Sequence, residues 1–445
     1  MTTKPALTRA KLHAAYAAGT TTPAELVSLI HRRMAEINDP GIFIHLVPEE
    51  TARAAAAALP PFDPVRYPLW GLPVAVKDNI DIEGLPTTAA CPGFAYVAKA
   101  SAPAVTALLD AGAVLIGKTN LDQFATGLVG VRTPYPVPRN AFDAARVPGG
   151  SSSGSAVAVA QGLATLSLGT DTAGSGRIPA ALNNLVGLKP SLGAVSTRGV
   201  VPACRTLDTI SVFAATVEDA WAGFEVIAAY DERDPQSRSM PAQDIAGAAP
   251  IRRIGVPPVP EIDDDAGRAA WDAARARLAR LGIAIEEVDL SAFHAVARLL
   301  YDGPWVAERA AAVGDFCAAK PGAVHPVTRG IIAGAGRFSA VDAFRGLYLL
   351  AELRRRTEPM WDRVDALAVP SAPCFPTLAE LEADPIGPNA RLGAYTNFVN
   401  LLDLAALALP GPFRPDRLPA GITLIAPRGS DARLAALGLR FQEAA

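Results

Sequence analysis

Residues 148–205 read PGGSSSGSAVAVAQGLATLSLGTDTAGSGRIPAALNNLVGLKPSLGAVSTRGVVPACR, and the rest of the chain is organised around this stretch. Two clusters rich in glycine and serine, at 149–155 and 174–176, flank an apolar segment that predicts a helix followed by a strand. Small residues permit close backbone approach, and a serine hydroxyl becomes a nucleophile when a base removes its proton. The stretch therefore predicts a serine nucleophile whose base lies upstream.

The base for such a serine has two possible sources. None of the five histidines lies in or near either cluster, and no GxSxG nucleophile elbow follows a predicted strand, so a Ser-His-Asp triad has no motif to support it. A buried lysine is the other source, because burial shifts an amine toward its neutral form. Lys77 follows the apolar residues 72–76, a predicted buried strand, and is the best-placed candidate. A solvated amine at a strand end is the alternative interpretation.

Ser175 lies in DTAGSG (171–176), between a predicted strand at 166–169 and a segment with Pro179 in its first helical turn. Free backbone N–H groups at such a turn can hydrogen-bond an oxyanion. A phosphate-binding turn is the alternative, but the segment lacks both GK[ST] and GxGxxG. The cluster at 149–155 also fits a flexible linker, against which its apolar flanks argue.

The remaining chain alternates predicted helices with predicted strands. Helices are predicted within residues 7–37 and at 53–59, 103–112, 217–229, 266–281, 293–312 with an interruption at Pro304, 341–351, 353–363 and 401–408. Strands are predicted at 114–117, 254–256, 284–288, 366–369 and 421–425. The alternation predicts an α/β fold with a large mixed or parallel sheet covered by helices on both faces. Residues 1–445 form one domain in this prediction, in which residues from about 230 to 340 form a subregion over the site.

Composition argues against several functional classes. Half of the residues are hydrophobic, the net charge is −3, and the 41 basic residues are dispersed, which argues against a nucleic-acid-binding face. No apolar run reaches the roughly 18 residues of a membrane span, and residues 1–19 lack the apolar core of a signal peptide. The four cysteines are far apart and form no CxxC, as in reduced cytosolic proteins. We therefore expect a cytoplasmic protein without metal or nucleotide cofactor.

Taken together, these segments resemble the amidase signature family over essentially the whole chain. Lys77, Ser151 and Ser175 stand at the positions of that family's Ser-Ser-Lys triad. The resemblance implies that Ser175 is the nucleophile, Ser151 the bridging serine and Lys77 the base of an acyl-enzyme mechanism. It also implies an oxyanion hole made by the backbone N–H groups of Thr172, Ala173, Gly174 and Ser175.

Within the family, the chain is most similar to the amidase domains of allophanate hydrolases. The similarity lies in GLPVAVKDNIDIEGLPTTAACP (71–92), KTNLDQFATGLVG (118–130), TDTAGSGRIPAALNNLVGLKP (170–190) and GVVPACRTLD (199–208). The segment YDGPWVAER (301–309) resembles the substrate-binding part of these domains, with Tyr301 and Arg309 as the binding residues. A substrate carboxylate away from the scissile amide suits the two-pronged donor of an arginine. An arginine on a helix surface is the alternative interpretation of Arg309.

The resemblance implies hydrolysis of allophanate (urea-1-carboxylate) to ammonia and N-carboxycarbamate, as in urea degradation. Alternatives are a carboxybiuret hydrolase, a malonamate-type amidase, or a non-catalytic subunit with the same fold, against which the intact lysine and serines argue. Family domains are commonly homodimers, and we expect the same here, with no nucleic-acid or membrane partner. Allophanate hydrolases carry a further C-terminal domain, and the sequence stops at Ala445. We expect the activity on N-carboxycarbamate to be absent or supplied by a separate protein.

Overall fold

The computed structural model describes residues 7–241 and 244–445. Residues 1–6, part of the stretch that lacks the apolar core of a signal peptide, lie outside the described residues. The strands are β1 (Phe43–Leu46), β2 (Pro73–Lys77), β3 (Pro86–Thr87), β4 (Tyr96–Val97), β5 (Val114–Thr119), β6 (Leu166–Asp171), β7 (Val186–Lys189), β8 (Thr209–Ala214), β9 (Arg253–Val256), β10 (Ala284–Glu287), β11 (Ala366–Pro370), β12 (Leu404–Pro410) and β13 (Gly421–Pro427).

The helices that connect and cover these strands are found along the whole described chain. They are α1 (Arg9–Ala17), α2 (Pro23–Ile37), α3 (Glu49–Ala57), α4 (Pro103–Asp110), α5 (Ser153–Ala160), α6 (Ile178–Leu182), α7 (Val217–Ile227), α8 (Asp265–Arg280), α9 (Ser291–Asp302), α10 (Val306–Ala319), α11 (Pro326–Ala333), α12 (Ala340–Thr357), α13 (Met360–Arg363), α14 (Leu378–Ala383), α15 (Gly387–Leu392), α16 (Asn397–Leu401) and α17 (Asp431–Glu443). None of those in the described ranges is long and apolar enough to cross a membrane.

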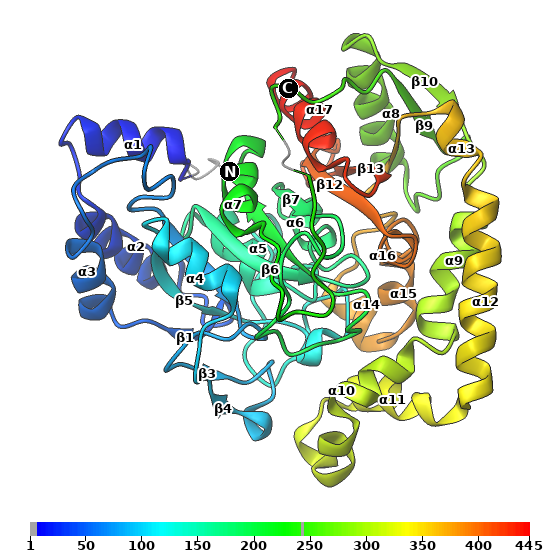
Figure 1. Ribbon diagram of the computed structural model, residues 1–445, viewed down its shortest axis with the longest axis horizontal. Coiled ribbons are helices and arrows are strands. Elements are labelled where there is room, and N and C mark those ends of the chain that lie inside the picture. The colour runs from blue at the N-terminus through cyan, green and yellow to red at the C-terminus, as the bar shows by residue number, and fades with distance from the viewer. Residues whose placement is uncertain (1–6, 242–243) are drawn as a thin grey trace.

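One large mixed sheet forms the centre of the molecule (Figure 1). Within the described residues it has 11 strands in the order β1-β5-β2-β6-β8-β7-β12-β13-β11-β9-β10. β2 is parallel to both of its neighbours, β5 and β6, whereas the pairs from β6 to β13 along the sheet are antiparallel. The predicted α/β fold with a large mixed sheet is confirmed.

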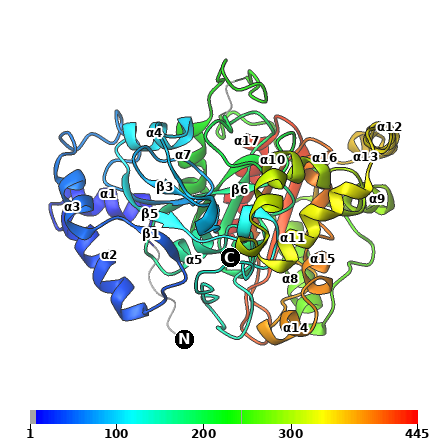
Figure 2. The same ribbon diagram turned by 90° about the horizontal axis from the view of Figure 1, so that it is seen from below.

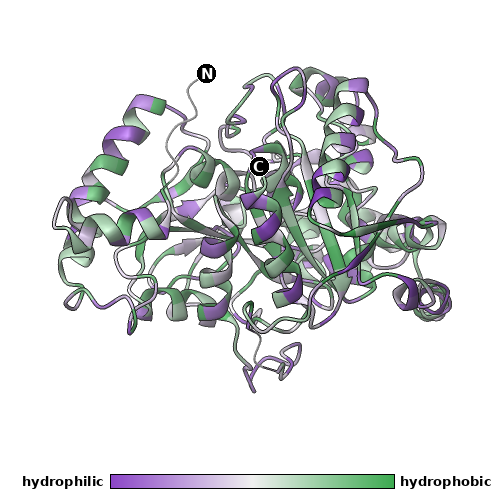
Figure 3. Cartoon of the chain, turned by 90° about the horizontal axis from the view of Figure 1, so that it is seen from above, coloured by the Kyte–Doolittle hydropathy of each residue, from purple (hydrophilic) through white to green (hydrophobic). Residues whose placement is uncertain are grey.

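Helices cover both faces of the sheet, as Figures 1 and 2 show. Successive side chains of a strand point to opposite faces, and β11 displays this alternation. Ala366 and Ala368 belong to the buried cluster that includes residues of α7, α8 and α17. Leu367 and Val369 belong to the cluster that includes residues of α9 and α16. The central strands are accordingly apolar, and polar residues gather on the surrounding helices (Figure 3).

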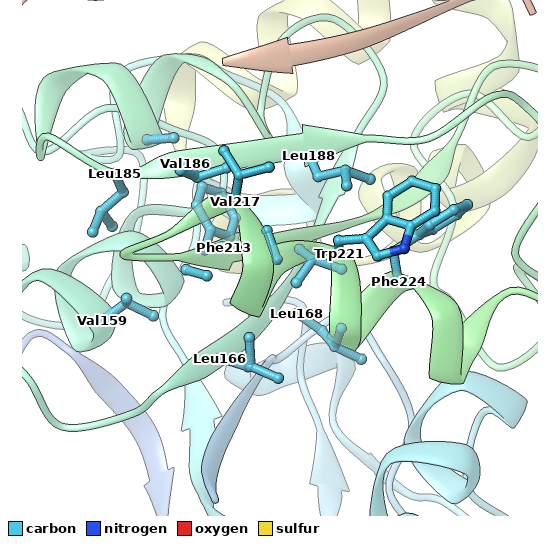
Figure 4. Packing of buried hydrophobic residues seen from close by; sticks show 14 of the residues in the cluster. Val159, Leu166, Leu168, Leu185, Val186, Leu188, Phe213, Val217, Trp221 and Phe224 are labelled. Atoms are coloured by element: carbon cyan, nitrogen blue, oxygen red, sulfur yellow. The ribbon is translucent and has the colours of Figure 1, made fainter. Parts of the chain in front are cut away.

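The packing around β6 fixes the strand that leads to the serine-rich turn. Leu166 and Leu168 of β6 pack with Phe213 of β8 and with Trp221 and Phe224 of α7 (Figure 4). Burial of each such side chain stabilises the fold by about 1.5–3 kcal/mol. The residues after β6 therefore follow a strand whose position is fixed by tight packing against β8 and α7.

Two predictions of secondary structure are wrong. Residues 401–408, predicted as a helix, are strand β12 after α16 ends at Leu401. The run is buried between β7 and β13, and a short apolar segment fits a buried strand as well as a helix. Residues 341–351 and 353–363, predicted as two helices, are the continuous α12 followed by the short α13.

Other predicted elements are confirmed in type and approximate position. Thr22 and Glu25 form a reciprocal capping box at the start of α2. The interruption at Pro304 separates α9 from α10, because proline lacks the N–H that a helix interior requires. Helices α9 to α12 lie along one edge of the molecule (Figure 1). The single domain spanning residues 1–445 stays a prediction.

Candidate active site

The catalytic candidates meet at one edge of the sheet, where two neighbouring parallel strands end. β2 ends at Lys77 and β6 ends at Asp171, just before the turn that carries Ser175. Ser151 lies shortly before α5, which packs against both strands. Because the carboxyl ends of parallel strands share one edge, the fold brings together residues that are far apart in sequence.

The Lys77 side chain is fully buried at this edge. Its Nζ lies 2.8 Å from Ser151 Oγ and 2.7 Å from Thr170 Oγ1. Burial lowers the pKa of Lys77 to about 7, although three nearby aspartates oppose the shift. It forms no ion pair with any carboxylate in the described part of the chain. Near neutral pH a large share of this amine is therefore uncharged and able to accept the Ser151 proton.

Ser151 is fixed through its own backbone. Its carbonyl accepts a hydrogen bond from the Asp122 N–H at 3.0 Å, and the Gly150 N–H donates to the Leu128 carbonyl at 2.7 Å. The peptide bond between Gly150 and Ser151 is cis. A Cβ on residue 150 would lie 2.4 Å from the backbone nitrogen of Gly130, so only glycine fits there.

Ser175 lies in the turn between β6 and α6 and is 3% exposed. Its hydroxyl donates to the Gly127 carbonyl at 3.5 Å. No hydrogen bond joins Ser151 to Ser175 anywhere within residues 7–241 and 244–445. Hydrogen bonds between catalytic groups are often long in substrate-free enzymes and shorten in the substrate complex. The structure thus brings Lys77 and Ser151 into direct contact, whereas the hydroxyl of Ser175, on the turn that follows the adjacent strand β6, is hydrogen-bonded to a carbonyl.

The turn before the nucleophile offers free backbone donors. Among the described residues, the N–H groups of Thr172, Ala173, Gly174 and Ser175 donate no hydrogen bond. Gly174 has φ +140°, and a Cβ there would lie 2.4 Å from Thr396 Oγ1. Such unpaired donors beside a nucleophile can stabilise a developing oxyanion.

A buried ion pair joins the two residues that flank this turn, Asp171 and Arg177. Arg177 donates to both carboxylate oxygens of Asp171 at 2.9 Å, and both side chains are inaccessible to solvent. Burial raises the pKa of Asp171, but the Arg177 charge and hydrogen bonds outweigh it and hold the pKa below its usual value. The sequence analysis does not identify either residue as part of the site. The signal available in the sequence is that an acidic and a basic residue directly flank TAGSG (172–176).

Tyr301 and Arg309 come from α9 and α10, and the fold brings them together. Arg309 is only 1% exposed, and its Nη2 donates to Tyr301 Oη at 3.2 Å. Its Nη1 donates to the Cys204 Sγ at 2.9 Å, and its Nε has no partner. Among the described residues no carboxylate lies within ion-pair distance of this guanidinium. A buried cation without a counterion is costly, so the site is complementary to an anionic group.

A pocket of about 500 Å³ reaches this pair at Tyr301, and Arg309 is not among the residues that line it. Tyr301 and Arg132 line it together with Asn389 and Asn397. Arg132 belongs to the loop that Asp122 holds through the Gly130 and Arg132 N–H groups, and the same loop supplies the Gly127 carbonyl that contacts Ser175. The pocket therefore adjoins the loop that contacts Ser175 and, through Tyr301, the pair of Tyr301 and Arg309, which we call the arginine clamp. No cluster of metal-binding side chains occurs among the described residues.

Comparisons with known proteins agree on one family. Residues 25–435 match the family model described as Amidase. The chain is 47% identical to urea amidolyase of Lachancea kluyveri over 84% of its length, but spans only 21% of that protein. It is 36% identical to a glutamyl-tRNA(Gln) amidotransferase chain of Symbiobacterium thermophilum, over 98% of this chain and 96% of that one. The structure superposes on allophanate hydrolase of Kluyveromyces lactis with a TM-score of 0.91 and 43% identity, covering 99% of this chain and 73% of that one.

Proposed function

The chain belongs to the amidase family, and we propose that it hydrolyses the terminal amide of allophanate, releasing ammonia and N-carboxycarbamate, in the degradation of urea. Two similar proteins support this substrate. One relative is a urea amidolyase, and one similar solved structure is an allophanate hydrolase. Since the chain spans about a fifth of the urea amidolyase, at 21%, the substrate is proposed for the site described here and not for a larger assembly.

The observation that carries the proposal is the buried, unpaired Arg309. Its guanidinium has a free Nε, donates hydrogen bonds to a thiol and a phenol hydroxyl, and lies 5.2 Å from the centre of the Tyr301 ring, but pairs with no described carboxylate. A substrate carboxylate would supply the missing counterion. Allophanate bears a carboxylate two bonds from its scissile ureido carbonyl. A neutral amide of the same shape would leave the arginine unpaired, which costs affinity.

The proposed mechanism uses the three residues at the sheet edge. Neutral Lys77 takes the proton of Ser151, which takes that of Ser175 as the Ser175 oxygen bonds to the terminal carbonyl carbon. The relay returns the proton to the leaving NH₂ group, and ammonia departs from a carbamoyl ester on Ser175. Water, deprotonated by the same relay, then releases N-carboxycarbamate and restores the serine.

The oxyanion formed in each step is proposed to bind the free N–H groups of residues 172–175. They are unpaired within the described chain and belong to the nucleophile and the three residues before it, so they are available to donate hydrogen bonds to the oxyanion. Loss of one such donor typically lowers turnover by about 10²–10³-fold.

We further propose that two copies of the chain associate through α12. Four of its apolar side chains are more than half exposed and recur three to four residues apart: Val341, Phe344, Leu347 and Tyr348. Asp342 lies in the first turn and Arg354, Arg355 and Arg356 in the last. Antiparallel pairing of two copies across a two-fold axis covers the apolar stripe and places Asp342 of each copy near the arginine-rich end of the other helix.

The four cysteines, all free, support a reducing compartment, and we propose a cytoplasmic location. We propose that a separate protein acts on N-carboxycarbamate, the product of the proposed reaction.

The proposal is tested by ammonia release from allophanate, carboxybiuret, malonamate, biuret and a hydrophobic amide, with Ser175→Ala as the control. We expect allophanate to be the best substrate and the Ser175 variant to be inactive. Preference for carboxybiuret or malonamate would keep the amidase activity and overturn the substrate. Turnover that survives loss of Ser175 would overturn the mechanism.

A further inference from the structure

Asp208 is a buried carboxylate, 7% exposed, that none of the roles above uses. It lies just before β8, and no described lysine, arginine or histidine forms an ion pair with it. Burial raises its pKa to about 6. Three donors satisfy it instead: the Thr172 hydroxyl, the Ala203 N–H at 2.8 Å and the Cys204 N–H at 3.1 Å.

These donors belong to two different parts of the site. Thr172 is the first residue of the turn whose N–H groups precede the nucleophile. Cys204 contacts Arg309 through its thiol, and burial raises the pKa of that thiol to about 12, so it stays neutral. A single oxygen of Asp208, Oδ1, therefore accepts one hydrogen bond from Thr172 in the oxyanion turn and another from Cys204, the residue that contacts Arg309.

The segment that carries Asp208 is also tied directly to α10. The Thr206 N–H and hydroxyl donate to the carboxylate of Glu308 at 2.9 and 2.5 Å. The Cys204 thiol lies 3.6 Å from the Trp305 carbonyl. Residues 203–208, which we call the strut, thus connect the turn after β6 to the start of α10 through hydrogen bonds. Asp208 makes the connection to the turn, through Thr172.

We propose that Asp208 is a positioning residue that connects the oxyanion turn to the arginine clamp. Through this connection the strut sets the distance between Arg309 and the N–H groups of residues 172–175. The inference rests on the proposed function, since it takes Arg309 as the group that binds the substrate carboxylate. Asp208 touches neither substrate nor reacting atoms, and acts through Thr172 and Cys204.

Isosteric substitutions separate the two arms of this strut. Thr172→Val removes the hydroxyl that donates a hydrogen bond to Asp208, whereas Thr172→Ser keeps that hydroxyl. Cys204→Ala removes the contact with Arg309, whereas Cys204→Ser keeps a polar atom there. Asp208→Asn replaces one acceptor oxygen by a donor. At Oδ1 this removes both arms, because Oδ1 accepts from the Thr172 hydroxyl and from the Cys204 N–H. At Oδ2 it removes the hydrogen bond from the Ala203 N–H and leaves a neutral amide oxygen, a weaker acceptor than a carboxylate, for both arms.

A buried aspartate outside the site provides the matched control. Asp234 also collects hydroxyl and N–H donors, from Ser196 and Thr197, but it contacts no catalytic or clamp residue. Asp234→Asn should lower stability as Asp208→Asn does and leave both kinetic constants unchanged.

The experiment measures kcat and KM for allophanate and for biuret, together with thermal unfolding. We expect Thr172→Val to lower kcat about 10-fold at nearly constant KM, in the range of a misplaced oxyanion donor. Cys204→Ala should raise KM for allophanate about 10-fold and leave KM for biuret unchanged, because biuret lacks the carboxylate. The serine variants should restore both values, and Asp208→Asn should show both defects without a further loss on adding Thr172→Val.

Each outcome decides the proposal. Wild-type kcat and KM in Asp208→Asn, or multiplied losses in the double variant, overturn it. If Asp208→Asn does not fold, Thr172→Val and Cys204→Ala decide, and wild-type constants in both overturn it. If the wild type does not hydrolyse allophanate, the proposed function is wrong, but the role of Asp208 can still be tested. The rate at which a fluorophosphonate labels Ser175 then tests the strut without any substrate: slower labelling in Thr172→Val and Asp208→Asn supports it, and unchanged labelling overturns it.

Discussion

The catalytic centre and the arginine clamp are built in different ways. Lys77, Ser151 and Ser175 come from the ends of adjacent strands and from the start of α5, in the most densely buried part of the molecule. Tyr301 and Arg309 come from α9 and α10, two helices outside the sheet that pack mainly against other helices (Figure 1). The difference suggests a division of labour, in which the sheet edge supplies reactivity and these two helices supply substrate choice.

The strongest way to break this comparison is to remove the nucleophile. Ser175→Ala should lower kcat for every amide by about 10⁴–10⁶-fold, as loss of a serine nucleophile does in other hydrolases. The change deletes one oxygen whose described hydrogen bond is long, so thermal unfolding should stay close to the wild type. Purified protein, an ammonia assay and a melting curve suffice, and residual wild-type turnover would contradict the account.

Replacement of the base should cost somewhat less. Lys77→Met keeps the apolar stem and removes the amine, and we expect kcat to fall by about 10³-fold or more for charged and neutral amides alike. Removing a desolvated amine from a buried site should not lower the unfolding temperature much. A loss confined to allophanate would place Lys77 in substrate binding and contradict its role as the base.

The pH profile sharpens the same point with a smaller effect. Burial lowers the pKa of Lys77 to about 7, and only the neutral amine can act as the base. kcat/KM should therefore rise about tenfold per pH unit below pH 7 and level off above it, for allophanate and for biuret. A profile that falls as the pH rises through 7 would require a protonated Lys77 and exclude the relay.

The smallest expected effect on catalysis comes from a change on α12. Phe344→Glu places a charge in the exposed stripe of α12, which should convert a dimer to a monomer in light scattering after gel filtration. kcat and KM should stay within about twofold, because none of the four residues of the stripe lines the pocket. A wild-type protein that is already monomeric would refute the pairing.

The residues that carry chemistry could be identified from sequence because their signals are local. Glycine–serine clusters, a lysine after an apolar strand and a proline in a first helical turn are each visible within a few residues. The structure places Lys77 against Ser151, but the assignment of roles stays a prediction. Tyr301 and Arg309 are identified through resemblance alone, since nothing between them except Pro304 marks the break that brings them together.

What sequence reasoning could not reach depends on tertiary contacts. The ion pair of Asp171 with Arg177, and the buried carboxylate of Asp208, look like ordinary surface charges until the fold buries them. The sequence predicts a helix where strand β12 lies, because a run of alanine and leucine fits either structure and only its position between β7 and β13 decides.

The division of labour is tested most directly by comparing allophanate with biuret, its neutral analogue, in the wild type and in Arg309→Met. We expect the wild type to favour allophanate by kcat/KM, and the substitution to lower kcat/KM for allophanate by about 10²–10³-fold through KM while biuret changes little. The ratio of the two specificity constants should therefore collapse. An unchanged ratio, or an equal loss of kcat for both amides, would contradict the claim that Arg309 selects the substrate and the sheet edge performs the reaction.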